Sequence, residues 1–136
     1  MIFVGVHCRK TDYDARLQAT GGCIVDHRFY DAALDIYRSR YDDEKNKVIF
    51  LAVSDNPAWI KVSWRSHSLQ FILFLQRNLG HHADVRFGSD YSKDNVPKAD
   101  LVGFDLCVLA TSQHSVHAYG TFGLWGSLLA GGDVVV

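Results

Sequence analysis

The stretch that decides the fold is Phe3-Val4-Gly5-Val6-His7-Cys8-Arg9-Lys10-Thr11-Asp12-Tyr13. Its first half is an apolar, Val-rich run that predicts a buried strand over residues 2–7, and its second half carries a histidine, two cations and a carboxylate. Open α/β sheets build their binding sites at the carboxyl ends of strands, which is where this charge stands. We therefore expect a site for an anionic ligand, such as one with phosphate groups, at the end of the first strand.

Predicted strands and helices alternate along the rest of the chain. Further strands are expected at 48–53, 84–87, 114–118 and 133–136, and helices at 27–41, about 58–78, 99–111 and 122–130. The polar segments 9–26 and 88–97 are expected to be loops. This alternation predicts an α/β fold: a Rossmann-like parallel sheet with helices on both faces, in one domain of residues 1–136.

Polar residues follow three of these strands, at 9–12, 54–56 and 119–121. Because the ends of parallel strands lie on one edge of a sheet, these residues are expected to converge. A phosphate at that edge would meet Arg9, the hydroxyl of Thr121 and the free N–H groups where a helix begins at Phe122.

The composition excludes several classes of protein. A chain of 136 residues with 48% apolar and 21% charged residues can bury one ordinary core and is unlike a disordered tail. The formal net charge of −1 gives no general attraction to nucleic acid. Three cysteines without metal-ligand spacing predict neither a disulfide scaffold nor a zinc site. The sequence shows no signal peptide and no uncharged apolar run of membrane-spanning length.

Each feature also has a simpler interpretation. The charged turn after the first strand is also typical of a solvated turn with a local ion pair, and His7 of a hydrogen-bonded core histidine. Asp105 would usually face solvent, and the pair at 81–82 is an ordinary loop pair rather than a metal site. No Walker loop, Gly-x-Gly-x-x-Gly turn or Gly-x-Ser-x-Gly turn is present. The residues alone predict an α/β domain that binds a nucleotide or phosphate ester.

Four ordered stretches resemble the superfamily of α1,2-, α1,6- and protein O-fucosyltransferases, most closely its galactoside 2-α-L-fucosyltransferase branch. Residues 3–13 resemble the His-x-Arg-Arg-x-Asp motif. The other stretches are 25–41, 48–59 and 105–133, the last of which includes Gly-Thr-Phe-Gly-Leu-Trp-Gly at 120–126. The resemblance covers nearly the whole chain, although residues 63–76 look inserted.

The resemblance implies the donor-binding half of a GT-B-like glycosyltransferase that transfers L-fucose from GDP-fucose to the 2-hydroxyl of a terminal galactoside. The reaction would invert the fucosyl carbon and need neither a metal nor a cofactor. The implied partners are GDP-fucose and a galactose-terminated glycan, with no nucleic acid. The implied location is the lumenal side of the Golgi membrane, and the acceptor domain and membrane anchor of such enzymes are not expected among these residues.

The resemblance also implies roles for residues of the first motif. Arg9 would bind the β-phosphate and stabilise the leaving GDP, while His7 and Asp12 would orient the donor and the arginine. Lys10 would assist at the donor, but it stands where the family has a second arginine, so it keeps the charge and loses the planar fork. The residue that deprotonates the acceptor stays open between Asp12 and a group from the acceptor domain.

The remaining implied roles concern the nucleotide. Asp105 would hold the edge of the guanine base. Thr121 and Phe122 would contact phosphate through a hydroxyl and a backbone N–H, and Ser54 and Asp55 would lie near the nucleotide. Two other functions stay open: a non-catalytic GDP-sugar-binding module or inactive fragment, and an enzyme whose acceptor is a protein hydroxyl or a core N-glycan.

Overall fold

The computed structural model describes residues 1–61, 79, 82–92 and 95–136. In chain order the elements are β1 (Ile2–Cys8), α1 (Tyr13–Thr20), α2 (His27–Tyr41), β2 (Val48–Ser54), α3 (Pro57–Ile60), β3 (Val85–Phe87), α4 (Gly88–Ser92), α5 (Leu101–Ala110), β4 (His114–His117), α6 (Thr121–Ala130) and β5 (Val134–Val135). All the predicted strands are present within two residues of their expected bounds, as are the helices predicted over 27–41, 99–111 and 122–130. The helix predicted over 58–78 is described only as α3, and the rest of it, with the inserted-looking 63–76, lies outside the described residues.

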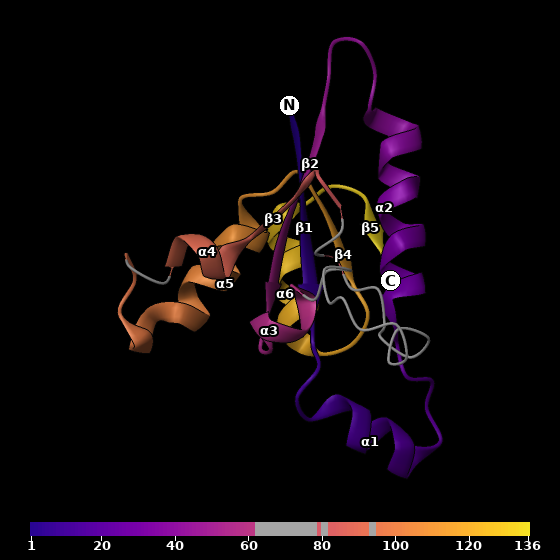
Figure 1. Ribbon diagram of the computed structural model, residues 1–136, viewed down its shortest axis with the longest axis vertical. Helices are drawn as coiled ribbons and strands as arrows, with labels where there is room; N and C mark the ends of the chain where they lie inside the picture. The colour runs from indigo at the N-terminus through magenta and orange to yellow at the C-terminus, as the bar shows by residue number, and fades with distance from the viewer. Residues whose placement is uncertain (62–78, 80–81, 93–94) are drawn as a thin grey trace, which may run out of the picture.

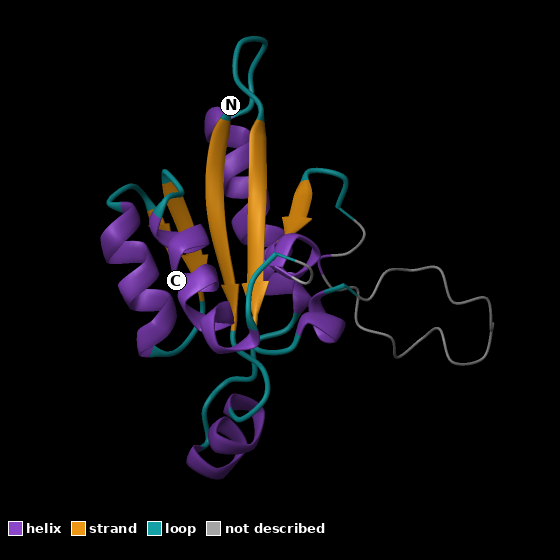
Figure 2. Ribbon diagram, turned by 90° about the vertical axis from the view of Figure 1, so that its left-hand side faces the viewer, coloured by secondary structure: helices purple, strands orange, loops and turns teal. Residues whose placement is uncertain are grey.

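The sheet confirms the predicted parallel α/β architecture. Within the described part of the chain, five strands pair in the order β3-β2-β1-β4-β5, and every pairing is parallel. Figure 2 shows the strands pointing the same way, with α1 beyond their carboxyl edge. The chain moves outward from β1 to β3 and then crosses to β4 on the other side of β1, so the switch point lies between β1 and β4. In such sheets the ligand crevice forms at this point.

Alternate residues of β1 face two different helical layers. Val4 and Val6 belong to the core cluster that also contains Leu34 and Tyr37 of α2. On the other face, a Cβ added at Gly5 would lie 3.1 Å from Leu109 Cδ2 of α5. Figure 1 shows α2 on one side of the sheet and α4, α5 and α6 on the other. His7, two residues after Gly5, therefore points toward the layer of α5 and α6.

Two helices begin at residues whose side chains cap them. The Asp26 carboxylate accepts a hydrogen bond of 2.9 Å from the backbone N–H of Arg28 at the start of α2. The Asn56 side chain accepts one of 3.0 Å from Trp59, and Pro57 opens α3. These caps satisfy N–H groups that have no partner inside the helix. The helix starts were therefore readable from the sequence. No helix in the described ranges is both long and apolar enough to cross a membrane.

The loop predicted over 9–26 was wrong, because it contains helix α1. This helix buries no residue, so it lacks the apolar periodicity by which helices are recognised. Its middle, residues 15–19, consists of good helix formers, and it ends at Gly21, whose φ of 71° forms a left-handed cap. The Gly21-Gly22 pair thus marks the end of a helix.

The loop predicted over 88–97 was also wrong in its first part, which forms the short helix α4. Gly88 opens α4 directly after β3, and a Cβ added there would lie only 2.9 Å from Val53 Cγ1 of β2. The glycine therefore permits close packing onto the sheet, where the sequence alone suggested a loop.

Gly132→Ala is expected to destabilise the fold by about 1–3 kcal/mol. A Cβ at Gly132 would overlap the backbone oxygen of Gln113 just before β4, so β4 or β5 would have to move. The matched control is Gly103→Ala inside α5, where an added Cβ meets nothing within 4 Å. That change is expected to stabilise by about 0.5–1 kcal/mol. Urea unfolding measures both, and equal effects would contradict this packing.

Candidate functional site

The carboxylate of Asp55 organises the loop that follows β1. Cys8 and Ser54 are register partners, so the residues after both strands lie side by side. Asp55 accepts hydrogen bonds from the backbone N–H groups of Lys10 at 2.9 Å and Thr11 at 3.1 Å, and another from the Thr11 hydroxyl. Burial alone would raise the pKa of Asp55, but these hydrogen bonds outweigh it and hold the pKa below its ordinary value. Asp55 is therefore an ionised anchor for the loop.

Arg9 is held along one edge of its guanidinium. Nε donates to Asp12 Oδ1 at 2.9 Å and Nη2 to Asp12 Oδ2 at 3.1 Å, while Asp55 Oδ2 lies 3.4 Å from Nε. The hydrogen bond from Arg9 lowers the pKa of Asp12. Nη1 makes no hydrogen bond to another described residue, and the side chain stays 35% exposed. The local ion pair that the sequence suggested exists, and it leaves the Nη1–Nη2 edge for a second acceptor such as phosphate.

Lys10 takes a different direction from Arg9. Its ammonium lies 2.8 Å from Asp14 Oδ2 of α1 and 4.7 Å from the centroid of the Trp59 ring of α3. The side chain is only 11% exposed. These contacts tie the loop to α1 and α3. Because the Lys10 ammonium is already paired with Asp14 and Trp59, it is not available to bind a phosphate.

The turn between β4 and α6 forms the opposite wall of the site. Gly120 has a φ of 94° and precedes α6, which begins at Thr121 without a side-chain cap. The first-turn N–H groups of α6 thus have no capping oxygen from Gly120, and such groups attract anions. Thr121 is exposed. The structure therefore offers hydroxyl and N–H donors at the position predicted for phosphate contact.

Two tyrosines bring these walls together: Tyr119, which was among the residues expected to converge at this edge, and Tyr13, to which the sequence analysis gave no role. The rings of Tyr13 and Tyr119 stack at 5.9 Å, and a Cβ added at Gly120 would lie 3.4 Å from the Tyr13 hydroxyl. Arg9 Cζ lies 6.0 Å from the same Tyr13 ring. Tyr13 thus stands between the guanidinium and the start of α6. The sequence feature that could have revealed Tyr13 is its position, because it is an aromatic residue directly after the charged motif.

His7 lies beneath this site and is neutral at physiological pH. It is 4% exposed, and burial lowers its pKa to about 4. Its ring lies 5.1 Å from Phe122, and Nδ1 is buried without a hydrogen-bond partner among the described residues. The simpler interpretation of His7 as a hydrogen-bonded core histidine was correct about its burial, but it was wrong about a hydrogen bond at Nδ1. The neighbouring His117, its register partner, binds the Ser127 hydroxyl through Nδ1 at 2.8 Å.

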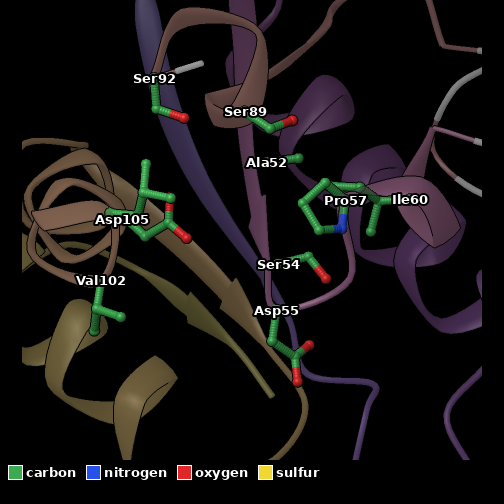
Figure 3. Close-up of a pocket in the computed structure, with 10 residues that line it drawn as sticks. Ala52, Ser54, Asp55, Pro57, Ile60, Ser89, Ser92, Val102 and Asp105 are labelled. Carbon is green, nitrogen blue, oxygen red and sulfur yellow. The ribbon is translucent and has the colours of Figure 1, made fainter. Parts of the chain in front are cut away.

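A cavity of about 290 Å³ opens beside the charged loop, between the end of β2 and helices α3, α4 and α5. Its lining comprises Ala52, Ser54, Asp55, Pro57, Ile60, Ser89, Ser92, Leu101, Val102 and Asp105. Figure 3 shows Asp105 on one side of this space and Ser54 with Asp55 on another. Ligand pockets begin at roughly 300 Å³, so the cavity suits one part of a ligand, such as a base.

Asp105 is partly buried in this cavity, so the expectation that it faces solvent was wrong. Burial raises its pKa to about 6. Ser54 is buried, and its Oγ accepts a hydrogen bond of 3.0 Å from the Asn56 backbone N–H. Asp55 both lines the cavity and contacts Arg9, so it joins the two halves of the site. The structure thus gathers Arg9, Asp12 and Asp55 at the charged loop, and Ser54 and Asp105 in the adjoining cavity.

Of the histidine pair at 81–82, the described member, His82, lies away from this site. Residue 81 lies outside the described residues, and His82 Nε2 lies 2.8 Å from Asp31 Oδ1, with Arg38 beside Nδ1. Among the residues that the structure describes, no group of three or more His, Cys, Asp or Glu side chains could hold a metal ion.

The family model described as "Glycosyl transferase family 11" matches residues 1–136. The chain belongs to glycosyl transferase family 11. A galactoside alpha-(1,2)-fucosyltransferase 2 from Pongo pygmaeus is 32% identical over 135 residues, which cover 98% of this chain and 32% of that protein. The galactoside 2-alpha-L-fucosyltransferase Sec1 of Mus musculus is 30% identical over 134 residues, which cover 98% of this chain and 30% of that protein. No solved structure matches.

This family 11 chain spans about a third of the length of the curated relatives it matches. The match extends from the first residue to the last, and the resemblance read from the ordered motifs covered nearly the whole chain. It therefore confirms the family expected from the sequence.

Proposed function

We propose that this family 11 chain is the donor-binding part of an enzyme that transfers L-fucose from GDP-fucose to the 2-hydroxyl of a terminal galactoside, inverting the fucosyl carbon without a metal. The names of the relatives support the transfer of fucose to a galactoside. The observation that carries it is that Arg9 and the uncapped start of α6 both lie against Tyr13, at the switch point of the sheet.

Arg9 has the central role in this proposal. When the bond from the fucosyl carbon to GDP breaks, negative charge collects on the β-phosphate. The open Nη1–Nη2 edge of Arg9 would bind that charge, and the N–H groups of Thr121 and Phe122 would approach it from α6. Because these donors are held in place before the reaction, little reorganisation is needed when the charge develops. Together they would supply the positive charge that many other transferases take from a divalent metal.

The neighbouring residues would position Arg9. Asp12 fixes one edge of the guanidinium, and its lowered pKa makes it a weak proton acceptor, so we assign it to orientation rather than to deprotonating the acceptor. Asp55 would act on the donor through the loop that it anchors. Lys10 would contribute by tying that loop to α1 and α3. Neutral His7, packed against Phe122, would support the start of α6 from below.

The cavity beside β2 would hold the guanine base. An ionised Asp105 can accept hydrogen bonds from N1–H and from the 2-amino group of guanine, whereas adenine presents an acceptor at N1. Asp55 would lie between the base and the diphosphate, with buried Ser54 forming the floor at the end of β2.

GDP affinity is expected to fall as the pH drops through about 6. Asp105 binds the base only as a carboxylate, and its pKa in the free protein is about 6. Above that pH the group is ionised and the affinity is full, and below it each pH unit costs up to about tenfold. Calorimetric titrations of GDP between pH 5 and 8 would measure this. Asp105→Asn is the control, because any pH dependence that remains in this variant comes from protonation of GDP itself. If the pH dependence were the same in the variant and in the unaltered protein, Asp105 would not be the group that binds the base.

The activity itself is tested with the complete polypeptide encoded by the gene, incubated with labelled GDP-fucose and a lactose-type acceptor. We expect fucose on the 2-hydroxyl of galactose, with the linkage and anomeric configuration established by NMR. Transfer to a protein hydroxyl or a core N-glycan instead would keep the enzyme class and change the acceptor. The proposed lumenal Golgi location rests on the family alone and is tested by microscopy of the tagged protein.

A second candidate is a GDP-sugar-binding module without catalysis. It is favoured by the inward position of Lys10, whose charge is taken by Asp14 and Trp59 and leaves Arg9 as the main cation of the loop. Calorimetric binding of GDP without any transfer would support this candidate over the enzyme.

A further inference from the structure

Ser89 of α4 lines the cavity that contains Asp105. Its Oγ is buried and has no hydrogen-bond partner among the described residues. Ser89 and Asp105 both line the cavity, and Figure 3 shows their side chains around the same space. Buried polar atoms are nearly always hydrogen-bonded in folded proteins, so an orphaned one beside a pocket points to a ligand that completes it.

The two side chains lie on adjoining parts of the cavity wall. Gly88 immediately precedes Ser89, and a Cβ added at Gly88 would lie 3.6 Å from Asp105 Oδ1. The carboxylate of Asp105 therefore stands next to the first turn of α4. A carboxylate accepts hydrogen bonds, while a serine hydroxyl can donate one. The pair is thus complementary to a ligand edge that presents donors beside an acceptor.

We propose that the Ser89 hydroxyl donates a hydrogen bond to the oxygen on carbon 6 of the guanine base, while Asp105 binds N1–H and the 2-amino group of the same edge. This rests on the proposed function, since it places guanine in the cavity. The oxygen on carbon 6, N1–H and the 2-amino group follow one another along the Watson–Crick edge of guanine. This order matches the hydroxyl donor of Ser89 on α4 followed by the carboxylate acceptor of Asp105 on α5.

A role of Ser89 in binding the base can be distinguished from a role in stabilising the fold. Because Ser89 Oγ has no described partner in the free protein, Ser89→Ala removes no internal hydrogen bond and should leave the melting temperature of the free protein unchanged or slightly higher. The loss should appear only when the base is bound. A matched control is Ser112→Ala, which deletes another buried hydroxyl. Ser112 follows α5, and its hydroxyl donates to the Val108 carbonyl near the end of that helix at 2.9 Å.

The test is calorimetric titration of the complete polypeptide with GDP and with IDP, whose base keeps the oxygen on carbon 6 but lacks the 2-amino group. We expect Ser89→Ala to weaken GDP and IDP binding by the same factor, on the order of 3- to 10-fold. Asp105→Asn should instead reduce the preference for GDP over IDP. Ser112→Ala should lower the melting temperature and leave both affinities unchanged.

The outcomes separate this inference from the proposed function. If the unaltered protein binds GDP but Ser89→Ala changes neither affinity, the role of Ser89 is overturned and the donor site stands. If Ser89→Ala weakens GDP but not IDP, the hydroxyl contacts the 2-amino group and the assignment to carbon 6 is overturned. If the unaltered protein does not bind GDP, both the donor site and the role of Ser89 are overturned.

Discussion

Replacing Arg9 by alanine in the complete polypeptide is expected to lower fucosyl transfer by about 10²–10³-fold, the usual effect of deleting one preorganised donor at a site of developing charge. Lys10 is not expected to replace the open edge of Arg9, because its ammonium is held by Asp14 and Trp59. Initial rates with labelled GDP-fucose measure the loss. It should fall mainly on kcat, because the charge on the leaving diphosphate is greatest in the transition state.

Two variants control for the charge and for the fold. Arg28→Ala removes an arginine that is 82% exposed and pairs locally with Asp26 at the start of α2, so it should leave the rate within about twofold. Arg9→Lys keeps the charge without the planar fork and should recover only part of the activity. If Arg9→Ala retained most of the activity, Arg9 would not stabilise the leaving group.

Asp55→Asn is expected to reduce both stability and transfer. The amide keeps the shape but puts an N–H₂ group or a weaker acceptor against the N–H groups of Lys10 and Thr11, at a cost of about 1–3 kcal/mol. Because hydrogen bonds hold the pKa of Asp55 below its ordinary value of 3.8, the carboxylate stabilises the fold above that pH and loses this effect as the pH falls below it. The stability difference between the variant and the unaltered protein should therefore shrink in acid.

The control for Asp55→Asn is Asp43→Asn, in the turn before β2. The Asp43 carboxylate also accepts from two backbone N–H groups, those of Lys45 at 2.8 Å and Asn46 at 2.6 Å, but at the opposite end of β2. Urea unfolding and transfer assays on both variants separate folding from positioning. We expect only Asp55→Asn to lose transfer at a temperature where both variants are folded. Equal activity of the two would refute the role of Asp55 as the anchor of the charged loop.

The sheet and the position of the site were predictable from the sequence because both follow from local patterns. Continuous apolar runs at 3–6 and 48–53 marked buried strands, and polar residues after them marked the edge of the candidate site. Helix α1 was not predictable by the same logic, since a helix that buries nothing leaves no apolar period. Helix α4 is too short to show one.

Within the site, residue types were easier to predict than directions. Arg9 and Asp12 pair on the loop after β1, and Asp105 lines the adjoining cavity. The inward turn of Lys10 depends on Trp59, which is distant in sequence and reaches it only through the packing of α3. The orphaned hydroxyl of Ser89 likewise exists only because α4, α5 and β2 enclose a cavity. Such features arise from tertiary packing, so no local pattern announces them.

The placement of the donor is tested most directly by a crystal structure of the protein with GDP bound. We predict the β-phosphate on the Nη1–Nη2 edge of Arg9 and at the first-turn N–H groups of α6, with the guanine edge on Asp105 in the cavity beside β2. A GDP molecule whose diphosphate lies away from both Arg9 and the start of α6 would contradict this donor site.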